Sequence, residues 1–597
     1  MPPLDPAVVV LAVIAASLVL FVTEALRYEV TALLMVVVLA LTDCLTPEEA
    51  FRGFSSGAVV LIAAMYVFGR AVTRWGLAET LGQRLLRLGG KSEARMGFLV
   101  TIASGLLSTV LSNTGVCAAL IPVVSTVGRR TGIPASRLMM PLAFGSLMGG
   151  MVTVIGTSSN IALNGVIVEA GREPFALFEF SALGLGLLVV GSLYFLSPLR
   201  RLLPRSRVDE SLTEHYQVPK FVSEILVEPS STLINRSVAD MPFFEKYGIT
   251  VLSIVRSESE ASVLAPGPYN RIRTEDVLIV QGEPDALLRM REDMNLRQRE
   301  SVTVGDQRLD SADVQLVEAV VPSRSSLEDR TLVEADFRAN SGLNVLALSK
   351  HGHVSPTKIG KTRLSVGDTL LIQGHRRDIE RVRRSRDLLV LGEVEIPPLG
   401  RGGLVTMVML ALVLLSAALG LVPISVAALT GAIALVLFRC VTAEEAVRAV
   451  DWSVVLLVGG VLALGLAFQR AGLGDEVASL FVELADDKFS PLLLLTCILT
   501  ATILLTQLTN NVAAAVIMAP IAISLAERTG LDDRALLVGV MVAASMAFMS
   551  PVGHQANTMV TGPGDYRFKD FLRVGTPLTL LMLLASILLL PLLWPLR

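Results

Sequence analysis

Two apolar stretches of the chain each carry a polar tripeptide near the middle. They read FLVTIASGLLSTVLSNTGVCAALIPVVSTV over residues 98–127 and PLLLLTCILTATILLTQLTNNVAAAVIMAPIAISL over residues 491–525. In a membrane, backbone that leaves the helical conformation survives only where it lines a cavity or is buried in protein. Each stretch is therefore predicted to form a re-entrant hairpin of two half-helices, with the tripeptide at its tip. The tripeptides are Ser112-Asn113-Thr114 and Thr509-Asn510-Asn511.

The composition indicates a membrane protein that also has a polar portion. Of the 597 residues, 52% are hydrophobic and 18% are charged, and the formal net charge is −3. These values exclude a disordered chain, a collagen-like repeat and a basic nucleic-acid-binding protein. The four cysteines form no CxxC pair, so neither a zinc site nor a disulfide framework is predicted. The sequence shows no nucleophile–base set and no metal-ligand set, so we do not expect an enzyme.

Ten further apolar runs surround the hairpins, five on each side of a polar central segment. A membrane span needs about 20 residues, so the shorter runs must tilt or borrow flanking residues. We predict a polytopic α-helical membrane protein in four parts: a transmembrane repeat over 1–205, two small domains over 206–300 and 301–392, and a second transmembrane repeat over 393–597. The predicted spans are Val8–Leu26, Val30–Leu41, Val59–Val72, Met139–Val168, Ala182–Phe195, Val405–Leu419, Val422–Leu437, Val454–Phe468, Ala535–Thr561 and Leu578–Leu590.

The two apolar portions repeat one another in sequence. LTPEEA at Leu45–Ala50 matches VTAEEA at Val441–Ala446 with an offset of 396, and GTSSN from Gly156 matches GHQAN from Gly553 with an offset of 397. The tripeptides also match at 397. Each portion holds five spans and one hairpin. Because five is an odd number, the second portion is predicted to be inverted in the membrane relative to the first.

The distribution of charge predicts the orientation. Positive residues flank the first hairpin, whereas the corresponding loop of the second portion is acidic, so the positive-inside rule places the first hairpin's opening in the cytoplasm and the second outside. Arginines flank the central segment, which is therefore predicted to be cytoplasmic, with both termini outside. The positive residues are Arg84, Arg87, Lys91, Arg95, Arg129, Arg130 and Arg137, and the acidic ones are Asp475, Glu476, Glu483, Asp486 and Asp487.

The central segment is itself duplicated. DVLIVQG at Asp276–Gly282 matches DTLLIQG at Asp368–Gly374 with an offset of 92. Each copy alternates short β-branched runs with polar turns and a helical stretch. Each has about 90 residues, a size that suits a small α+β domain.

The polar clusters shared by both portions indicate where chemistry takes place. The segments that contain them hold no Asp, Glu, Lys or Arg, so a charged substrate must be neutralised by backbone dipoles, hydroxyls, amides or a co-bound ion. Unwound carbonyls and side-chain oxygens suit Na⁺, and an asparagine offers one acceptor and two donors. The predicted Na⁺ ligands are Ser108, Ser112, Asn113 and Gly156 in the first portion, and Thr506, Asn510 and Gly553 in the second.

His554 is the one histidine in the apolar portions, and it stands where the first portion has Thr157. An ionisable residue within a membrane segment is by default a functional-site hypothesis. Its ring could donate a hydrogen bond to an oxyanion or titrate near neutral pH. With its neighbour Gln555, it would face the hairpin tips. The predicted substrate contacts are Asn113, Thr114, Thr157, Asn510, Asn511, His554 and Gln555.

These motifs resemble a known family. Paired tripeptides in hairpins, each followed by a broken helix with a GTxxN-like loop, resemble the divalent anion/sodium symporters (DASS) of the ion transporter superfamily. LSNTGVCAALIPV and GTSSN match closely, whereas Thr509-Asn510-Asn511 and GHQAN depart from the dicarboxylate transporters. The string SPVGHQANTMVTGPGDYRFKDF is similar to the sodium/sulfate symporter branch of bacteria and algae. That branch carries paired TrkA-C (RCK C-terminal) domains, which the central segment resembles, and no GxGxxG motif adds a dinucleotide-binding half.

The resemblance implies Na⁺-coupled uptake of a divalent anion, with sulfate as the expected substrate. It further implies that Na⁺ binds first and organises the anion site, that the site moves as a rigid body, and that the protein is a homodimer in the cell (inner) membrane. We expect no organic cofactor, although a small cytosolic ligand could bind the TrkA-C-like domains and regulate transport. The alternatives are a Na⁺/dicarboxylate symporter, a Na⁺/H⁺ or arsenite transporter of the same superfamily, and a ligand-gated channel. An antiporter would be expected to hold Asp or Glu at the membrane midplane, and the core motifs hold none.

Overall fold

The structure is a computed structural model of the chain. It describes residues 5–23, 25–204, 222–238, 243, 247, 249–256, 262–264, 266, 270–281, 284–298, 314–323, 325–350, 353–355, 359–385, 387–391, 400–474, 476, 479 and 490–596. Of the acidic residues used to predict orientation, Asp475, Glu483, Asp486 and Asp487 lie outside this part.

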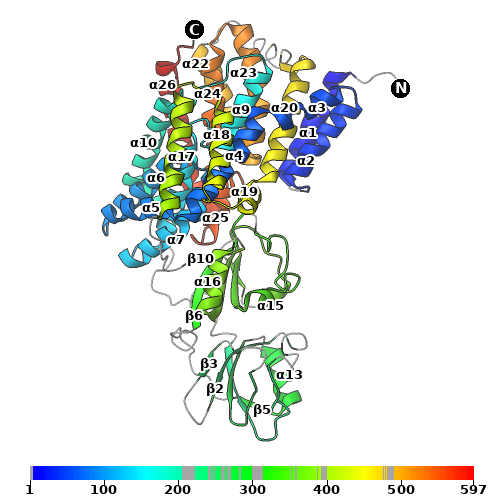
Figure 1. Ribbon diagram of the computed structural model, residues 1–597, viewed down its shortest axis with the longest axis vertical. Helices are drawn as coiled ribbons and strands as arrows, with labels where there is room; N and C mark the ends of the chain where they lie inside the picture. Colours follow the sequence, from blue (N-terminus) through cyan, green and yellow to red (C-terminus); the bar gives the residue numbers. More distant parts are fainter. Residues whose placement is uncertain are drawn as a thin grey trace.

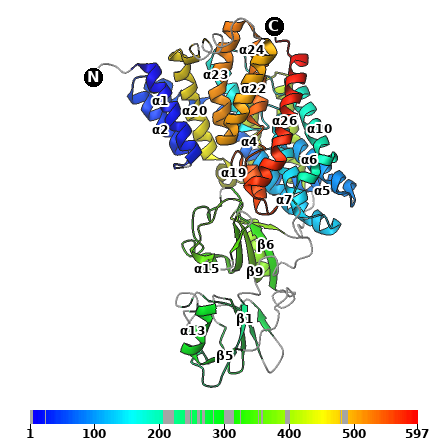
Figure 2. The same ribbon diagram turned by 180° about the vertical axis from the view of Figure 1, so that it is seen from behind.

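A body of packed helices carries two small mixed units stacked at one of its ends (Figures 1 and 2). The first half of the body contains these helices: α1 (Pro6–Thr23), α2 (Tyr28–Leu41), α3 (Pro47–Arg52), α4 (Gly57–Arg74), α5 (Leu77–Leu86), α6 (Glu93–Ser108), α7 (Asn113–Thr131), α8 (Met139–Gly150), α9 (Ser158–Glu169) and α10 (Ser181–Leu196). The second half contains α17 (Arg401–Ala418), α18 (Ile424–Leu437), α19 (Ala443–Ala449), α20 (Trp452–Arg470), α22 (Pro491–Leu508), α23 (Asn511–Thr529), α24 (Asp533–Ala544), α25 (Gln555–Thr561) and α26 (Phe568–Leu593).

Many of these helices are apolar enough for a membrane. In the described part, six helical segments have the length and composition to cross a bilayer, and the pair formed by α7 and the segment Ala135–Gly150, bent by 113°, adds a seventh. Four shorter apolar helices accompany them. The runs 139–168 and 535–561 are each broken, because the chain leaves the helix after Gly150 and Ala544 and resumes at Ser158 and Gln555.

The hairpin tips correct the register predicted from the tripeptides. Ser112 caps α7 by accepting a hydrogen bond from Gly115 N (3.3 Å), and Asn510 caps α23 by accepting one from Val512 N (2.8 Å). The equivalent residues are therefore Ser112 and Asn510, and Asn113 and Asn511, at an offset of 398 instead of 397. A side-chain oxygen that can accept from the first turn decides where a helix begins.

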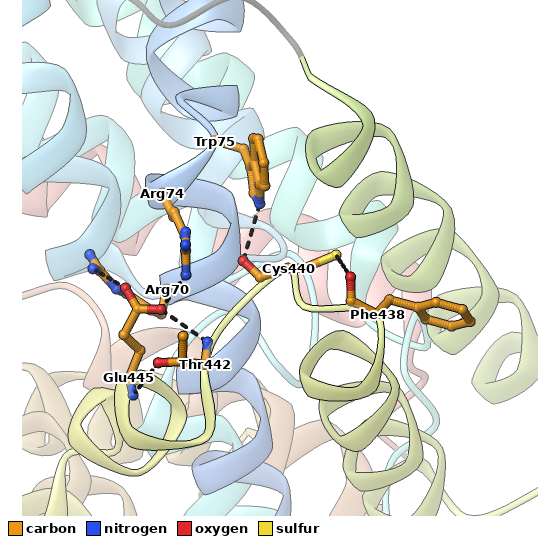
Figure 3. Close-up of polar contacts among 7 residues, drawn as sticks. All are labelled: Arg70, Arg74, Trp75, Phe438, Cys440, Thr442 and Glu445. Carbon is orange, nitrogen blue, oxygen red and sulfur yellow. Dashed lines mark hydrogen bonds and ion pairs between the residues drawn. The ribbon is translucent and has the colours of Figure 1, made fainter.

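Ion pairs cross between the halves at two equivalent places. Glu49 closes a capping box with Thr46 and forms a bidentate pair with Arg470, whose Nη1 lies 2.7 Å from Oε2. Glu445 closes the equivalent box with Thr442 and accepts from Arg70 (3.0 Å) and from Arg74 (Figure 3). Each half thus supplies the carboxylate for a guanidinium of the other.

The central segment forms two five-stranded sheets with the same strand order. The first unit contains β1 (Val222–Val227), β2 (Thr250–Val255), β3 (Ser262–Leu264), β4 (Val277–Gln281), α13 (Pro284–Met294) and β5 (Leu296–Gln298), in the order β3-β2-β4-β1-β5. The second contains β6 (Val314–Val320), α15 (Phe337–Ser341), β7 (Asn344–Lys350), β8 (His353–Ser355), β9 (Thr369–His375), α16 (Arg376–Arg384) and β10 (Leu389–Leu391), in the order β8-β7-β9-β6-β10. Equivalent strand pairs, β2–β4 and β7–β9, each carry a bulge.

The two units pack against each other through apolar residues of both sheets. Leu252 and Ile279 of the first unit share a cluster with Leu346 and Leu371 of the second. Gln281 Nε2 also donates to Leu346 O across this contact. The units therefore form one continuous insert between the helical halves.

Candidate functional site

One cavity lies where the two hairpin tips meet the two helix breaks. All seven residues predicted to contact substrate line it, together with Ser112, Gly156 and Gly553 from the predicted Na⁺ ligands. No Asp, Glu, Lys or Arg is among the lining residues. Three helices of twelve or more residues, α7, α9 and α23, begin at this cavity, so their positive N-terminal ends point to one place. The seven are Asn113, Thr114, Thr157, Asn510, Asn511, His554 and Gln555.

Asn113 and His554 face each other across the halves. Ser108 Oγ donates to Asn113 Oδ1 (2.6 Å), which leaves the amide nitrogen directed away, 3.4 Å from His554 Nε2. His554 Nδ1 caps α25 by accepting from Ala556 N (3.0 Å), so in the neutral ring the proton is on Nε2. Both facing atoms are therefore hydrogen-bond donors. An oxygen acceptor that bridges the two nitrogens from the cavity side would satisfy both.

The equivalent residues of the opposite halves make the reciprocal contact. Asn511 Nδ2 donates to Thr157 Oγ1 (3.3 Å) and to Ser159 Oγ (3.4 Å). Asn113 and Asn511 are the first residues of α7 and α23, and Thr157 and His554 are the caps of α9 and α25. The first residue of each hairpin's second helix therefore contacts the N-cap of the broken helix in the other half.

Oxygen atoms gather beside each tip. A side chain at Gly156 would meet Ser108 O at 3.1 Å and Gly150 O at 2.8 Å, and one at Gly553 would meet Thr506 O at 3.1 Å. A side chain at Gly156 would therefore collide with the backbone, and one at Gly553 would be tightly packed. In the described part, no three His, Cys, Asp or Glu side chains group as metal ligands, so a cation here would rely on neutral oxygens.

Several predicted Na⁺ ligands already have other partners. Ser112 Oγ and Asn510 Oδ1 accept the capping hydrogen bonds described above, and Thr506 Oγ1 donates to Ala544 O (2.7 Å). Ser108 Oγ donates to Asn113 Oδ1. The hydroxyl groups of Ser108, Ser112 and Thr506 each use only the proton or one lone pair in these hydrogen bonds, so each oxygen can accept another partner. Neutral oxygens of the type that coordinate Na⁺ therefore lie beside each tip.

Comparison with known proteins shows which family this chain belongs to. A family model described as "Citrate transporter" (CitMHS) matches residues 18–530, and again 485–596. The uncharacterized transporter sll0640 of Synechocystis is 35% identical over 597 residues, which is 98% of this chain and 96% of that protein. This chain belongs to the CitMHS transporter family.

Relatives of this CitMHS transporter include proteins named for two anion classes. Sodium/sulfate cotransporter 2 of Chlamydomonas reinhardtii is 27% identical over 378 residues, covering 62% of this chain and 42% of that protein. The sodium-dependent dicarboxylate transporter SdcS of Staphylococcus saprophyticus is 26% identical over 199 residues, covering 31% and 38%. The DASS-type resemblance seen in the motifs is thus confirmed at the level of the family.

Two groups of residues in this CitMHS transporter were missed by sequence reasoning. Asn160 and Asn557 are fully buried, and the Oδ1 atom of each has no hydrogen-bond partner. They are the final letters of GTSSN and GHQAN, so the repeated motif was a usable signal. The second group is an apolar and aromatic wall of the cavity on α2, α4 and α20, for which apolar helices give no local signal. It consists of Tyr28, Ile62, Met65, Tyr66 and Val454.

Proposed function

We propose that this CitMHS transporter is a Na⁺-coupled symporter of a divalent inorganic oxyanion, with sulfate as its substrate. The observation that carries the proposal is the pair of facing donors, Asn113 Nδ2 and His554 Nε2, in a cavity whose lining has no charged side chain. Sulfate has four oxygens that only accept hydrogen bonds, so a site for it needs donors that converge. Gln555 and Asn511 add further amide donors to the same cavity.

Charge balance supports the coupling to Na⁺. Two negative charges in a neutral cavity are stabilised by helix N-termini, but each such end contributes only about half an elementary charge. Co-bound cations at the neutral oxygens beside Ser108 and Thr506 would supply the remainder. Relatives named as sodium/sulfate and sodium-dependent dicarboxylate transporters support the choice of cation.

The same proposal includes the path of the substrate. The two halves act as inverted repeats, with Asn113 and Asn511 at equivalent hairpin tips, and the site alternates between the two sides of the cell membrane as a rigid body within a homodimer. The insert lies in the cytoplasm and regulates transport, and both termini lie outside. The equivalent capping boxes at Glu49 and Glu445 and the matching hairpin and break contacts support the repeat.

The test is uptake of radiolabelled sulfate into proteoliposomes with and without an inward Na⁺ gradient. Uptake that requires Na⁺ and is inhibited by unlabelled sulfate more strongly than by succinate is expected. Stronger inhibition by succinate or citrate, with labelled succinate taken up instead, would assign a dicarboxylate substrate. Uptake that persists at full rate without Na⁺ would refute the coupling.

A further inference from the structure

The second unit of the insert contacts the helical body through β10 and through one tight turn. The turn Ser365–Asp368 precedes β9, and Ser365 N donates to Asp368 Oδ2 (2.8 Å). Gly367 lies so close to α25 that a side chain there would meet Thr558 O at 2.2 Å. From the helix side, a side chain at Gly562 would meet Gly367 O at 2.0 Å and Thr369 Oγ1 at 2.3 Å. The backbone of the turn therefore touches the backbone at the end of α25 directly. A side chain at either Gly367 or Gly562 would prevent this contact.

The first unit shows that the turn alone does not require glycine. Its equivalent turn has the same hydrogen bond, from Arg273 N to Asp276 Oδ2 (2.7 Å), but carries Glu275 at φ 63° where the second unit has Gly367 at φ 86°. A glutamate is accepted in the first unit, which lies farther from the helical body than the second unit (Figures 1 and 2). The contact with α25 is therefore a reason for glycine at 367 in addition to the backbone conformation.

Other differences between the units fall on the same face. Val366 replaces Thr274, and Leu391 replaces Arg299, both at the offset of 92. Val366 and Leu391 pack with Val320 into the same apolar cluster as the membrane helices, and β10 contacts α7. Both changes exchange a polar side chain for an apolar one, as expected for a permanently covered surface.

The opposite end of α25 lies in the substrate cavity. His554 caps this helix and Gln555 is its first residue, and both line the cavity. Seven helical residues span about 10 Å, so the contact with the insert and the donors to substrate are about two helical turns apart. Figures 1 and 2 both place α25 at the end of the body that adjoins the insert.

The point where the insert rejoins the body is fixed elsewhere. The indole of Trp75, at the end of α4, packs against the start of α17, where a side chain at Gly402 would meet it at 2.1 Å. Trp75 Nε1 donates to Cys440 O (3.2 Å; Figure 3). The equivalent residue of the second half is Ala471, so the indole is present only where the insert ends. The start of α17, where the chain re-enters the body, is thus held against α4, while the second unit is held against α25 and α7.

We propose that the insert is a mechanical bridge: its second unit holds α25 through Gly367 and Gly562 and contacts α7 through β10, and its conformation sets the position of His554 and Gln555 relative to α7. This inference rests on the proposed function, because it takes the cavity as the transport site. A ligand or modification of the insert would then alter transport only by favouring one position of α25, which requires different affinities for the two positions.

The test compares full-length Gly367→Ala with Gly342→Ala in nanodiscs. Gly342 is a matched control, since it lies in the same unit at φ 74° and a side chain there would meet the Asp378 carboxylate at 3.2 Å instead of a membrane helix. Hydrogen exchange of the α25 amides is expected to be about tenfold faster in Gly367→Ala, a change equivalent to about 1.4 kcal/mol, and unchanged in Gly342→Ala. Sulfate uptake should fall in the first variant alone.

Two further variants keep the inference testable if Gly367→Ala does not fold. Gly562→Ala places the obstruction on the helix side, and Val366→Thr restores the residue of the first unit. Unchanged α25 exchange in the folded variants among these three would overturn the bridge, as would faster exchange without any change in uptake. If wild type takes up no sulfate but α25 still loosens in Gly367→Ala, the contact stands and the proposed substrate is wrong.

Discussion

Asn160 and Asn557 occupy the same hydrogen-bonding frame in the two halves of the chain. Asn160 Nδ2 donates to Gly150 O (2.9 Å) and Thr153 O (3.0 Å), and Asn557 Nδ2 donates to Ala547 O (2.6 Å) and Ser550 O (2.9 Å). The carbonyls of Thr153, Ala547 and Ser550 belong to the non-helical breaks that border the cavity, and Gly150 is the last residue of α8. A buried backbone carbonyl without a donor is costly, so each asparagine stabilises the irregular backbone of its own break.

Asn160→Ala and Asn557→Ala should each destabilise the protein. Each variant removes two hydrogen bonds to backbone carbonyls, although Thr153 O keeps the one that it accepts from Gly156 N (3.3 Å). An unsatisfied buried group costs about 1–3 kcal/mol. The measurement is the thermal unfolding midpoint of the purified protein in detergent. Asn340→Ala is the control, because its amide makes one hydrogen bond, to Ala335 O, on the exposed surface of the insert. Equal midpoints for all three variants would contradict the role given to the two frames.

Removing Na⁺ should also lower the unfolding midpoint of the wild type. A ligand that binds only the folded state stabilises it by about 2.7 kcal/mol at a hundredfold excess over its Kd. Replacing NaCl with choline chloride removes this contribution. Ser108→Ala should lose part of the Na⁺ effect, whereas Ser104→Ala, which is equally buried on α6 and donates to Thr101 O, should keep it. A midpoint that does not respond to Na⁺ in the wild type would argue against cation sites at the tips.

Transport should depend on the first residue of each hairpin's second helix. Asn113→Ala and Asn511→Ala each remove an amide donor from the cavity, a loss of about 1.5–3 kcal/mol for a charged ligand. That corresponds to roughly ten- to a hundredfold weaker substrate binding. Asn164→Ala is the matched control, since its amide bonds only the backbone of Phe175. Normal sulfate uptake by purified Asn113→Ala or Asn511→Ala would refute a shared site.

Polar residues within apolar runs made the two tips and all seven residues that line the cavity predictable, whereas the broken helices were implied only by the family resemblance. An interruption in a membrane helix is conspicuous because every backbone group there needs a partner. The register of the second tip was wrong by one residue, since Asn510 and Asn511 are chemically identical and only the cap on Val512 N distinguishes them. The cross-half pairs of Glu49 and Glu445 were not predicted, because a local pattern does not identify a distant partner.

The contact between the insert and α25 could not be predicted from the sequence, for a similar reason. Gly367 and Thr558 are far apart in sequence, and glycine in a turn is ordinarily explained by its backbone freedom. Only the comparison with Glu275, at the same place in the duplicated unit, points to a further cause. The wall formed by Tyr28 and Tyr66 had no signal at all, since aromatic residues are common in apolar helices.

His554 has two separable roles, and substitutions can distinguish them. Its Nδ1 caps α25, and its Nε2 faces Asn113 in the cavity. Alanine removes both roles, whereas asparagine is a favourable N-cap whose shorter side chain does not extend as far as Nε2. His554→Ala should therefore lower stability by about 1 kcal/mol through loss of the cap. It should also raise the KM for sulfate by roughly ten- to a hundredfold through loss of the donor.

His554→Asn is the decisive variant. It should keep the stability of the wild type and still show the raised KM, because the cap remains while the donor is lost. His375→Ala, on the exposed end of β9, controls for the loss of a histidine as such. The two KM values and the unfolding midpoints are measured on the same purified preparations. If His554→Asn recovered the wild-type KM, the histidine would act only by capping α25, and the oxyanion would have to find its donors elsewhere in the cavity.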